Sequence, residues 1–450
     1  MIETHYAILG CGWAGVLASY FILENFDNVS VVCVEKENIL GGLLRSEIVN
    51  SFVFDIGGSH VIFSKDQKIL REMLSFLENN VIEHHRKSYI YLDDIFVPYP
   101  FENGIWVLPP ERRAEILVSF VETLLERAKD LNWRPRNLRE WVYGFFGKEI
   151  ARLYLEPYNE KIWKRPLDGI DVDWIYIPGR LPIPDWRDVI RSGAGVTTEG
   201  YREQARFYYP SRGGIQALYN AVLERAIARG LKVIKGMRVE KIRRASDRWI
   251  INDRIGAKRI ISTTPLNELV EALEAPEYIL KLARQLEYNM VVVVGIALKK
   301  KAPDMHWVYV PDKNIVFHRY IWISNYSPYN TPSSKYSSVI AEISLPPQSN
   351  IDTEKLVYEI VEGLKKLGVL SEYEKELLFV KMWTNTYGYP IPTFKSTKAR
   401  SEILDYIREQ GICTVGRWGT WRYLNMDIIY KEAKEVALQS NNNTSLVSDA

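Results

Sequence analysis

The first residues whose types and spacing could support chemistry are three glycines near the N-terminus, Gly10, Gly12 and Gly15. The spacing Gly-x-Gly-x-x-Gly is a weak signal alone, but an apolar strand precedes it, a helical stretch follows it, and Glu35 comes about 20 residues later. Gly10 would form the tight turn, Gly12 would admit a pyrophosphate at the helix N-terminus, and Gly15 would let helix and strand pack closely. Glu35 can accept hydrogen bonds from both ribose hydroxyls. The pattern predicts a dinucleotide-binding βαβ unit rather than a plain tight turn.

A second set of glycines follows directly. The stretches ILGGLLRSE, residues 39–47, and FDIGGSHVIFS, residues 54–64, each carry a glycine pair. A glycine pair directly after the acidic residue is typical of flavoproteins rather than NAD dehydrogenases, because the chain can fold back over a larger cofactor. The two glycines before His60 indicate a backbone that passes close to a flat group. We therefore expect FAD as the cofactor.

A third candidate is the stretch VFHRYIWISNYSPYNTP, residues 316–332. It alternates like a strand and then breaks at Pro328. It carries one arginine, Arg319, together with Tyr320, Tyr326 and Tyr329. Two interpretations are open: a half-buried strand with aromatic packing, or a strand that lines a pocket for an anionic ligand.

The composition limits the classes of partner. The formal net charge of the 450 residues is +2, so the surface as a whole has no bias toward nucleic acids, and any anion site must be local. The three cysteines show neither metal-ligand spacing nor a disulfide framework, which favours a reducing compartment and no metal. The N-terminus does not resemble a signal peptide, and the longest apolar run, residues 290–298, is too short to span a bilayer. We expect a soluble, cytoplasmic protein without a membrane span.

The elements that would position these residues alternate between strands and helices. Residues 411–440, GICTVGRWGTWRYLNMDIIYKEAKEVALQS, repeat the order strand, glycine turn and helix, so the nucleotide domain must be discontinuous. The predicted fold class is α/β, with a discontinuous Rossmann-type FAD-binding domain, an inserted helical domain and an antiparallel β-sheet domain. The predicted boundaries are 1–80, 205–265 and 395–440 for the FAD-binding domain, 106–175 for the helical domain, 81–105, 176–204 and 266–394 for the antiparallel-sheet substrate domain, and 441–450 for a flexible tail.

Three local features can also be predicted. Asn137 is placed to cap the helix that begins NLREWVYGFF, with Glu140 three residues on. The stretch YGYPIPTF, residues 387–394, reads as a proline-bounded loop. Residues 190–204, which are rich in Gly and Thr, are either a plain loop or, as we prefer, a flap that closes over the substrate.

Several stretches together carry a family resemblance, in order and over nearly the whole chain. They are FVPYPFENGIWVLP (96–109), PYNEKIW (157–163), RFYYPSRGG (206–214), SNYSPYN (324–330), YGYPIPT (387–393) and GRWGTWRYLNMD (416–427). The glycine fingerprint is shared with amine oxidases and protoporphyrinogen oxidases. With these stretches the chain resembles the UDP-galactopyranose mutase family, and its eukaryotic-type branch in particular.

The resemblance implies a role for each matching residue. Arg180, Arg319 and His60 would be catalytic: the arginines would clamp the diphosphate of a UDP-sugar, because a guanidinium fork binds phosphate oxygens in pairs, and His60 would lie on the flavin face. Arg86 and Ser88 match a flanking site where a nicotinamide could dock, so NAD(P)H could serve as the reductant. The implied substrate-binding residues are Tyr326, Tyr389, Tyr423, Tyr309, Trp307, Asn159, Tyr154, Tyr99, Phe101, Glu102 and Gln204. The implied cofactor-binding residues are Gly10, Gly12, Gly15, Glu35, Gly42, Arg45, Gly58, Ser59, Arg417 and Asp427.

The activity that the resemblance implies is an isomerisation without net redox change. Reduced FAD attacks the anomeric carbon of a UDP-hexopyranose, with UDP-galactopyranose as the first choice, and expels UDP. The sugar opens and recloses through another hydroxyl, so the pyranose becomes a furanose for cell-surface glycans. Catalysis would then rest on positioning and on stabilising the leaving diphosphate, which explains why no Ser-His-Asp, metal or paired-carboxylate pattern is evident.

The chain departs from the family pattern at four positions, which leaves the sugar undetermined. Ser59 is an extra residue before His60, Glu102 stands where a glutamine is expected, Gln204 replaces an asparagine, and Asn425 replaces an acid. Each assignment also has a purely structural alternative. The arginines could be surface ion-pair partners, the tyrosines and Trp307 could be core aromatics, and His60 could be a hydrogen-bonded loop residue.

Two other functions stay open. An FAD-dependent oxidoreductase of the amine oxidase or protoporphyrinogen oxidase type would need a hydrophobic substrate tunnel and no diphosphate clamp. A flavin-binding protein without catalysis would keep the glycine fingerprint and Glu35 but would bind no nucleotide sugar. The sequence does not indicate the oligomeric state.

Overall fold

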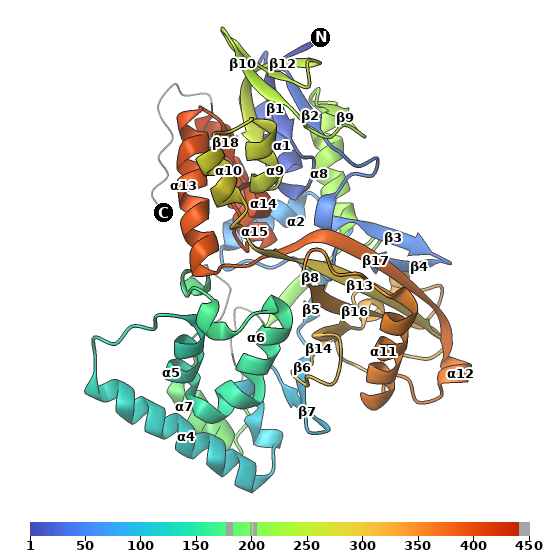
Figure 1. Cartoon of the computed structure of the whole chain (residues 1–450). Helices are drawn as coiled ribbons and strands as arrows, with labels where there is room; N and C mark the ends of the chain where they lie inside the picture. Colours follow the sequence, from blue (N-terminus) through green and yellow to red (C-terminus); the bar gives the residue numbers. More distant parts are fainter. Residues whose placement is uncertain (177–182, 199, 201–204, 441–450) are drawn as a thin grey trace.

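The computed structural model describes residues 1–176, 183–198, 200 and 205–440. Its architecture is mixed α/β, as expected from the sequence. Figure 1 shows one large sheet with its helices at the top, a second large sheet at the right, and a group of helices at the lower left. The predicted domain boundaries remain a prediction. None of the described helices is long and apolar enough to cross a membrane.

The first large sheet gathers strands from three distant stretches of the chain. Its order is β10-β11-β12-β1-β2-β9, and β18 pairs with β12. β1 runs parallel to β12 and β2, which places the carboxyl ends of these strands at one edge. The strands are β1 (Ile2–Leu9), β2 (Val31–Val34), β9 (Lys232–Ile234), β10 (Ile242–Ala245), β11 (Arg248–Ile251), β12 (Ile255–Ser262) and β18 (Cys413–Thr414).

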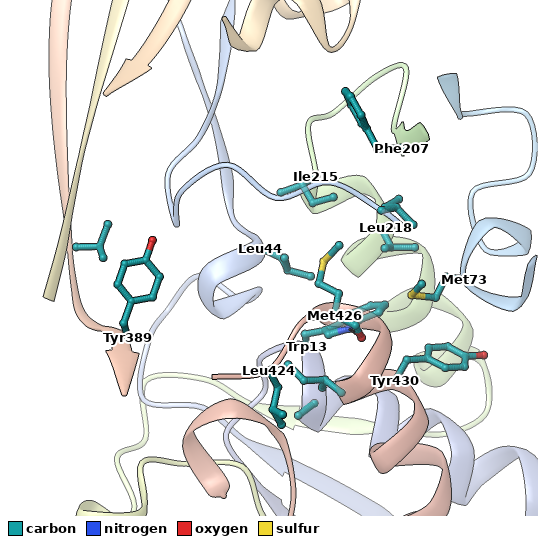
Figure 2. Close-up of a cluster of buried hydrophobic side chains, with 14 of the residues drawn as sticks. Trp13, Leu44, Met73, Phe207, Ile215, Leu218, Tyr389, Leu424, Met426 and Tyr430 are labelled. Carbon is teal, nitrogen blue, oxygen red and sulfur yellow. Dashed lines mark hydrogen bonds between the residues drawn. The ribbon is translucent and has the colours of Figure 1, made fainter. Parts of the chain in front are cut away.

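Helices from both ends of the chain pack beside this sheet. Figure 2 shows the buried side chains of Trp13, Leu44, Leu424 and Met426 gathered where α1 meets α15. The Trp13 Nε1–H donates to the Met426 carbonyl at 3.1 Å, so the last helix is fixed to the first. The helices are α1 (Trp13–Asn25), α2 (Gln67–Ser75), α8 (Gln216–Ala228), α9 (Leu266–Ala272), α10 (Glu277–Ala283), α13 (Phe394–Glu409), α14 (Gly416–Gly419) and α15 (Met426–Gln439).

The second large sheet has the order β17-β13-β16-β15-β14-β6-β7 and is antiparallel except for the pair β14–β6. Alternate residues of β13 enter two different cores, since successive side chains point to opposite faces of a sheet. One face packs on α11 (Thr353–Lys366), and the other contributes to the large core cluster that also holds residues of β1 and α1. The strands are β6 (Ser88–Leu92), β7 (Ile95–Pro98), β13 (Tyr288–Leu298), β14 (Trp307–Tyr309), β15 (Arg319–Ile321), β16 (Ser337–Leu345) and β17 (Leu377–Pro390); the short helix α12 (Tyr373–Glu376) precedes β17.

The remaining elements connect these layers. Two small antiparallel sheets of two strands each pair β3 (Ser46–Val49) with β4 (Phe52–Asp55), and β5 (Ile82–His85) with β8 (Arg206–Tyr209). The helices at the lower left of Figure 1 include α4 (Pro110–Lys129), α5 (Leu138–Ile150), α6 (Glu156–Trp163) and α7 (Trp186–Gly193). The short helix α3 (Phe101–Gly104) contacts α7. The predicted cap of α5 is confirmed, because the Asn137 side chain accepts the Glu140 N–H at 2.9 Å.

Two local predictions need correction. The stretch 387–394 is not a loop throughout, because β17 continues to Pro390 and pairs with the start of β13. The long antiparallel register of that pair outweighs the turn signal, and the proline is tolerated because it ends the strand. The segment 190–204 is helical at its start, where α7 packs on α4. Residues 199 and 201–204 of that segment lie outside the described residues.

Candidate active site

A groove lies at the edge where β1 and β2 end. It encloses a cavity of about 290 Å³, and the predicted cofactor residues Gly10, Gly12, Glu35, Gly42 and Arg45 line it. The turn at Gly10 has φ +87°, a conformation that favours glycine. Its carbonyl accepts from the Thr263 hydroxyl at 3.0 Å, which joins the turn to the end of β12.

Gly15 acts on packing rather than on the groove surface. A Cβ at this position would lie 2.0 Å from the Gly10 carbonyl oxygen, a distance that no side chain can occupy. α1 can therefore start directly behind the turn. This is the role that the sequence pattern predicted for the third glycine.

Glu35 is held in place by backbone groups. Its Oε2 accepts from the Cys11 N–H at 2.9 Å, and its Oε1 accepts from the Glu37 N–H at 3.1 Å. The carboxylate forms part of the groove lining and also lines a smaller cavity toward Arg238 and Glu268. Two fixed acceptor oxygens facing a groove suit vicinal ribose hydroxyls.

These features fit an adenine dinucleotide such as FAD. Gly12 occupies the N-cap position of α1 and has no side chain to cap the helix, so the first N–H groups of α1 are available to a pyrophosphate. A Cβ on Gly42 would lie only 3.3 Å from the Gly12 Cα. The backbones of these two glycines therefore lie close together, and side chains at these positions would take up space in the groove. The Arg45 Nε–H donates to the Gly42 carbonyl at 3.0 Å and fixes the second glycine turn. Asp427 lies in neither main cavity lining, and its Oδ2 accepts from the Ser64 hydroxyl at 2.8 Å.

A second cavity, also of about 290 Å³, continues from the groove. His60, Arg417 and Met426 line both cavities and therefore form the partition between them. The His60 Nδ1 is 2.9 Å from the Gly58 carbonyl oxygen. Burial and the nearby Arg417 guanidinium lower the pKa of His60 to about 3, so its imidazole is neutral at physiological pH. The Arg417 Nε–H and Nη2–H donate to the Leu424 carbonyl at 3.2 and 2.8 Å.

The structure brings most of the sequence-predicted substrate residues together around this second cavity. Its lining includes Tyr99, Tyr154, Asn159, Trp307, Tyr309, Arg319, Tyr326, Tyr389 and Tyr423, together with Gly58 and Ser59. Phe101 and Glu102 are not part of that lining and are buried in α3, where the Phe101 ring stacks on Tyr154 at 5.6 Å. Arg180 and Gln204 lie outside the described residues. Apart from these positions, the predicted set shares one cavity, while the role of each residue remains a prediction.

The tyrosines present protonated hydroxyls. Burial raises the pKa of Tyr99, Tyr326 and Tyr389 far above the ordinary value, so none of them ionises near neutral pH. The Tyr326 hydroxyl is 3.0 Å from the Ser59 Oγ. A cavity lined by arginine and neutral phenols offers hydrogen-bond donors to an anion with little competing negative charge.

Arg86 is a second fixed cation in the lining. Its guanidinium lies 4.1 Å from the ring centre of Tyr99 and 4.8 Å from that of Trp307. Its Nη2–H donates to the Tyr309 hydroxyl at 3.1 Å, and its Nε–H donates to the Ser88 Oγ at 2.8 Å. Aromatic contacts and two hydrogen bonds therefore fix this cation at the cavity wall.

Arg319 is oriented by Glu342, a residue that the sequence analysis did not identify. β15 and β16 place the two residues directly opposite each other. The Arg319 Nε–H donates to the Glu342 Oε2 at 2.7 Å, and the Arg319 Nη2 forms an ion pair with the same oxygen, also at 2.7 Å. Burial is the largest single influence and acts to lower the pKa of Arg319. Glu342 together with the nearby phenols of Tyr389, Tyr158 and Tyr423 outweighs burial and holds that pKa well above its usual value. A signal was present, since Glu342 is the one charged residue within the apolar strand SSVIAEISL.

Among the described residues, no group of three or more His, Cys, Asp or Glu side chains is placed to hold a metal ion. The polar groups that line the second cavity are its arginines, its phenols and the neutral imidazole. These groups can bind an anion and stabilise developing negative charge.

Two family models match this chain. The model for an NAD(P)-binding Rossmann-like domain matches residues 8–77, and the model for flavin-containing amine oxidoreductases matches residues 175–417. A curated relative, coproporphyrinogen III oxidase of Staphylococcus aureus, is 23% identical over 188 residues, which is 39% of this chain and 39% of that protein. The match thus spans well under half of that relative.

Solved structures resemble the whole chain. A crystal structure of reduced UDP-galactopyranose mutase superposes with a TM-score of 0.86 and 24% identity, covering 98% of this chain and 94% of that one. A provisional protoporphyrinogen oxidase from Exiguobacterium sp. 255-15 superposes with a TM-score of 0.73 and 16% identity, covering 97% and 98%. At these sequence identities the structural similarity establishes the fold but not the activity, which has to be inferred from the residues of the site.

Proposed function

The chain belongs to the family of flavin-containing amine oxidoreductases, and we propose that within this flavin-binding fold it is a flavin-dependent isomerase of a UDP-hexose. The proposed reaction interconverts the pyranose and furanose forms, with UDP-galactopyranose as the first substrate to test. The observation that carries the proposal is the second cavity, in which Arg319 and neutral tyrosines face a space that shares His60 and Arg417 with the cofactor groove.

FAD bound in the groove would, when reduced, supply the nucleophile for the anomeric carbon. The residues of the chain have the remaining tasks. Arg319, Tyr326 and Tyr389 hold the diphosphate and stabilise the charge that builds up as UDP leaves. Tyr99, Tyr154 and Asn159 lie on the same wall and are assigned to the uridine.

The neutral state of His60 suits its place in the partition. A cationic imidazole beside Arg417 would attract the diphosphate away from Arg319, whereas a neutral ring only orders the loop through its bond to Gly58. Arg86, fixed by Tyr99 and Trp307, belongs to the flanking position proposed for the nicotinamide of a reductant. The charge on Arg86 suits the phosphates of such a dinucleotide.

A second candidate is an FAD-dependent oxidase, which is favoured by the family model and by the named oxidases among the similar proteins. Oxidases of amines or porphyrinogens need an apolar path to the flavin. The cavity next to the flavin groove instead contains Arg86, Arg206, Arg319 and Arg417. This lining favours an anionic substrate over an apolar one.

A paired incubation tests the proposal. Purified holoprotein is mixed with UDP-galactopyranose, once in air and once anaerobically after reduction with dithionite, and the furanose isomer is sought by chromatography. Isomer in the reduced sample alone is the expected result. No isomer, together with no binding of UDP, would reject the UDP-sugar function and favour the oxidase. No isomer with tight binding of UDP would retain the diphosphate site and exclude galactose as the sugar.

A further inference from the structure

The loop of residues 57–60, the flavin-face loop, rests on the same buried carboxylate that holds Arg319. The Ser59 N–H donates to the Glu342 Oε1 at 2.8 Å, while Arg319 uses the Oε2. Gly58 lies so close that a Cβ there would be 3.4 Å from the Oε1. Glu342 itself has no exposed surface. One carboxylate therefore contacts the partition on one side and the proposed diphosphate clamp on the other.

A second link runs through the side chain of Ser59, the residue that the sequence adds before His60. The Ser59 Oγ is 3.0 Å from the Tyr326 hydroxyl, and the Tyr326 carbonyl is 2.8 Å from the His84 Nε2. The flavin-face loop is thus connected to Arg319 through its backbone and to Tyr326 through its side chain. Because all these groups are buried or half-buried, a change at one of them cannot be absorbed by solvent.

From these contacts we infer that Glu342 is a positioning residue for both parts of the site: it orients Arg319 toward the cavity and fixes the flavin-face loop. The part of the inference that concerns the nucleotide rests on the proposed function. Glu342 does not line the cavity and would not touch the substrate. It acts because its carboxylate holds the Nε and Nη2 side of Arg319, a residue that lines the cavity.

The chemistry of a glutamine at this position shows why the charge is needed. The Arg319 Nε–H donates to Oε2, which the cationic Nη2 also approaches at 2.7 Å, and the Ser59 N–H donates to Oε1, so both oxygens must be acceptors. The amide nitrogen of Glu342→Gln would face a donor in either orientation. One buried donor would then lack an acceptor, and Arg319 or the flavin-face loop would move.

The test uses holoprotein and two separate readouts. The absorption spectrum of the bound flavin reports on the flavin-face loop without any nucleotide, and titration with UDP reports on Arg319. We expect Glu342→Gln to change the flavin band and to raise the Kd for UDP at least about tenfold, the effect of losing one charge-assisted hydrogen bond. The control is Glu47→Gln. The Glu47 carboxylate also binds a cation, Lys381, and accepts from the Trp383 Nε1–H, but it lines neither cavity.

A double-mutant cycle separates positioning from general damage. If Glu342 acts through Arg319, then Glu342→Gln adds little to the Kd change already caused by Arg319→Lys. Additive effects, or a Glu342→Gln protein with wild-type spectrum and wild-type Kd, would overturn the inference. If wild-type protein does not bind UDP, the proposed function fails, and the flavin spectrum alone decides the loop half of the inference. If Glu342→Gln does not fold, Arg319→Lys must still change the ligand-free flavin spectrum through Glu342, and an unchanged spectrum would reject the link.

Discussion

Single residues set the electrostatics of this site. Arg319 is the cation with the most direct control, because a fully buried carboxylate fixes its orientation and neutral tyrosines surround it. A planar fork held in this way binds two phosphate oxygens at defined positions, which a flexible ammonium cannot do. The exchange of arginine for lysine therefore tests geometry while the charge is kept.

We expect Arg319→Lys to lower kcat/KM for the UDP-sugar roughly 30-fold, because the bidentate contact is lost. This corresponds to a rise of about 2 kcal/mol in the activation free energy. Steady-state kinetics of the reduced enzyme measure the effect. The matched control is Arg284→Lys, at an exposed arginine paired with Glu277, which should keep wild-type kinetics. Equal activity of the two variants would show that Arg319 does not bind the diphosphate.

The depressed pKa of His60 gives a prediction about acid stability. Its folded-state pKa is about 3 and its unfolded value about 6.5, so the unfolded chain binds the extra proton first. The stability that His60 contributes is therefore complete above about pH 6.5 and is lost as the pH falls toward 3. Part of the ring faces the cavity, so water weakens the effect.

We expect His60→Gln to lose less unfolding free energy than wild type when the pH is lowered from 7.5 to 5, as measured by urea denaturation. Asp55, whose pKa is raised to about 6 by burial, changes stability in the opposite direction. Because Asp55 is present in both proteins, the difference between them isolates His60. Parallel losses in the two proteins would mean that His60 titrates normally.

Sequence reasoning worked well for residues with a local pattern and failed for those that depend on register. The glycine spacing and Glu35 were found because strand, turn and helix are contiguous in the chain. Glu342 was missed because its importance arises only when β15 and β16 pair with Arg319 opposite Glu342. Phe101 and Glu102 were predicted to bind substrate; they are buried in α3 and do not line the second cavity themselves, although the Phe101 ring stacks on Tyr154, which does.

At the scale of elements, a buried lysine of α6 attaches this helix to the turn between β14 and β15. The Lys161 Nζ donates to the carbonyl oxygens of Val310, Asp312 and Phe317 at 2.8, 2.8 and 2.7 Å. This turn leads directly into Arg319, and α6 carries Asn159. The same contact therefore sets the distance between two walls of the cavity.

We expect Lys161→Met to destabilise the fold by about 2–4 kcal/mol, because three buried carbonyls would lose their donor. Lys313→Met is the control, since Lys313 is exposed and only pairs with Glu160, which should be worth about 0–1 kcal/mol. Urea denaturation followed by tryptophan fluorescence measures both. Similar values for the two variants would show that the three hydrogen bonds do not fasten α6.

The turn into α1 gives the second prediction at this scale. Gly15→Ala would place a methyl group 2.0 Å from the Gly10 carbonyl oxygen, so α1 must move away from β1. We expect purified Gly15→Ala protein to retain little FAD, as judged by the ratio of absorbance at the flavin band to that at 280 nm. Gly169→Ala is the control, because nothing lies within 4 Å of its Cβ position. Full flavin content in the Gly15→Ala protein would show that FAD binding does not depend on the close approach of α1 to the Gly10 turn.

At the scale of the whole molecule, the first large sheet, which carries the cofactor groove, is assembled from strands of three parts of the chain. β1 and β2 come first, β9 to β12 follow the first insertion, and β18 comes after the second large sheet. The discontinuity was predictable, since a strand, glycine turn and helix return late in the sequence. The length of β17 was not, because its continuation to Pro390 depends on pairing with β13.

This arrangement predicts that the cofactor domain cannot fold from its N-terminal part. A chain that ends at residue 411 lacks β18, α14 and α15, and with them Arg417 and the Trp13–Met426 contact. We expect such a chain to retain no FAD, whereas a chain that ends at residue 440 should retain it fully. Flavin content after gel filtration distinguishes the two. FAD retention by the shorter chain would contradict the role assigned to the last helix.

The partition formed by His60, Arg417 and Met426 has a consequence for the order of assembly. Each of these side chains lines both the cofactor groove and the second cavity. A cofactor bound in the groove would therefore form part of the boundary of the second cavity. A sugar nucleotide that binds before the cofactor would find the second cavity open toward the empty groove. Loading should therefore be sequential, with the cofactor first, and partly flavinated preparations should behave as mixtures of competent and incompetent molecules rather than as a uniformly weaker enzyme.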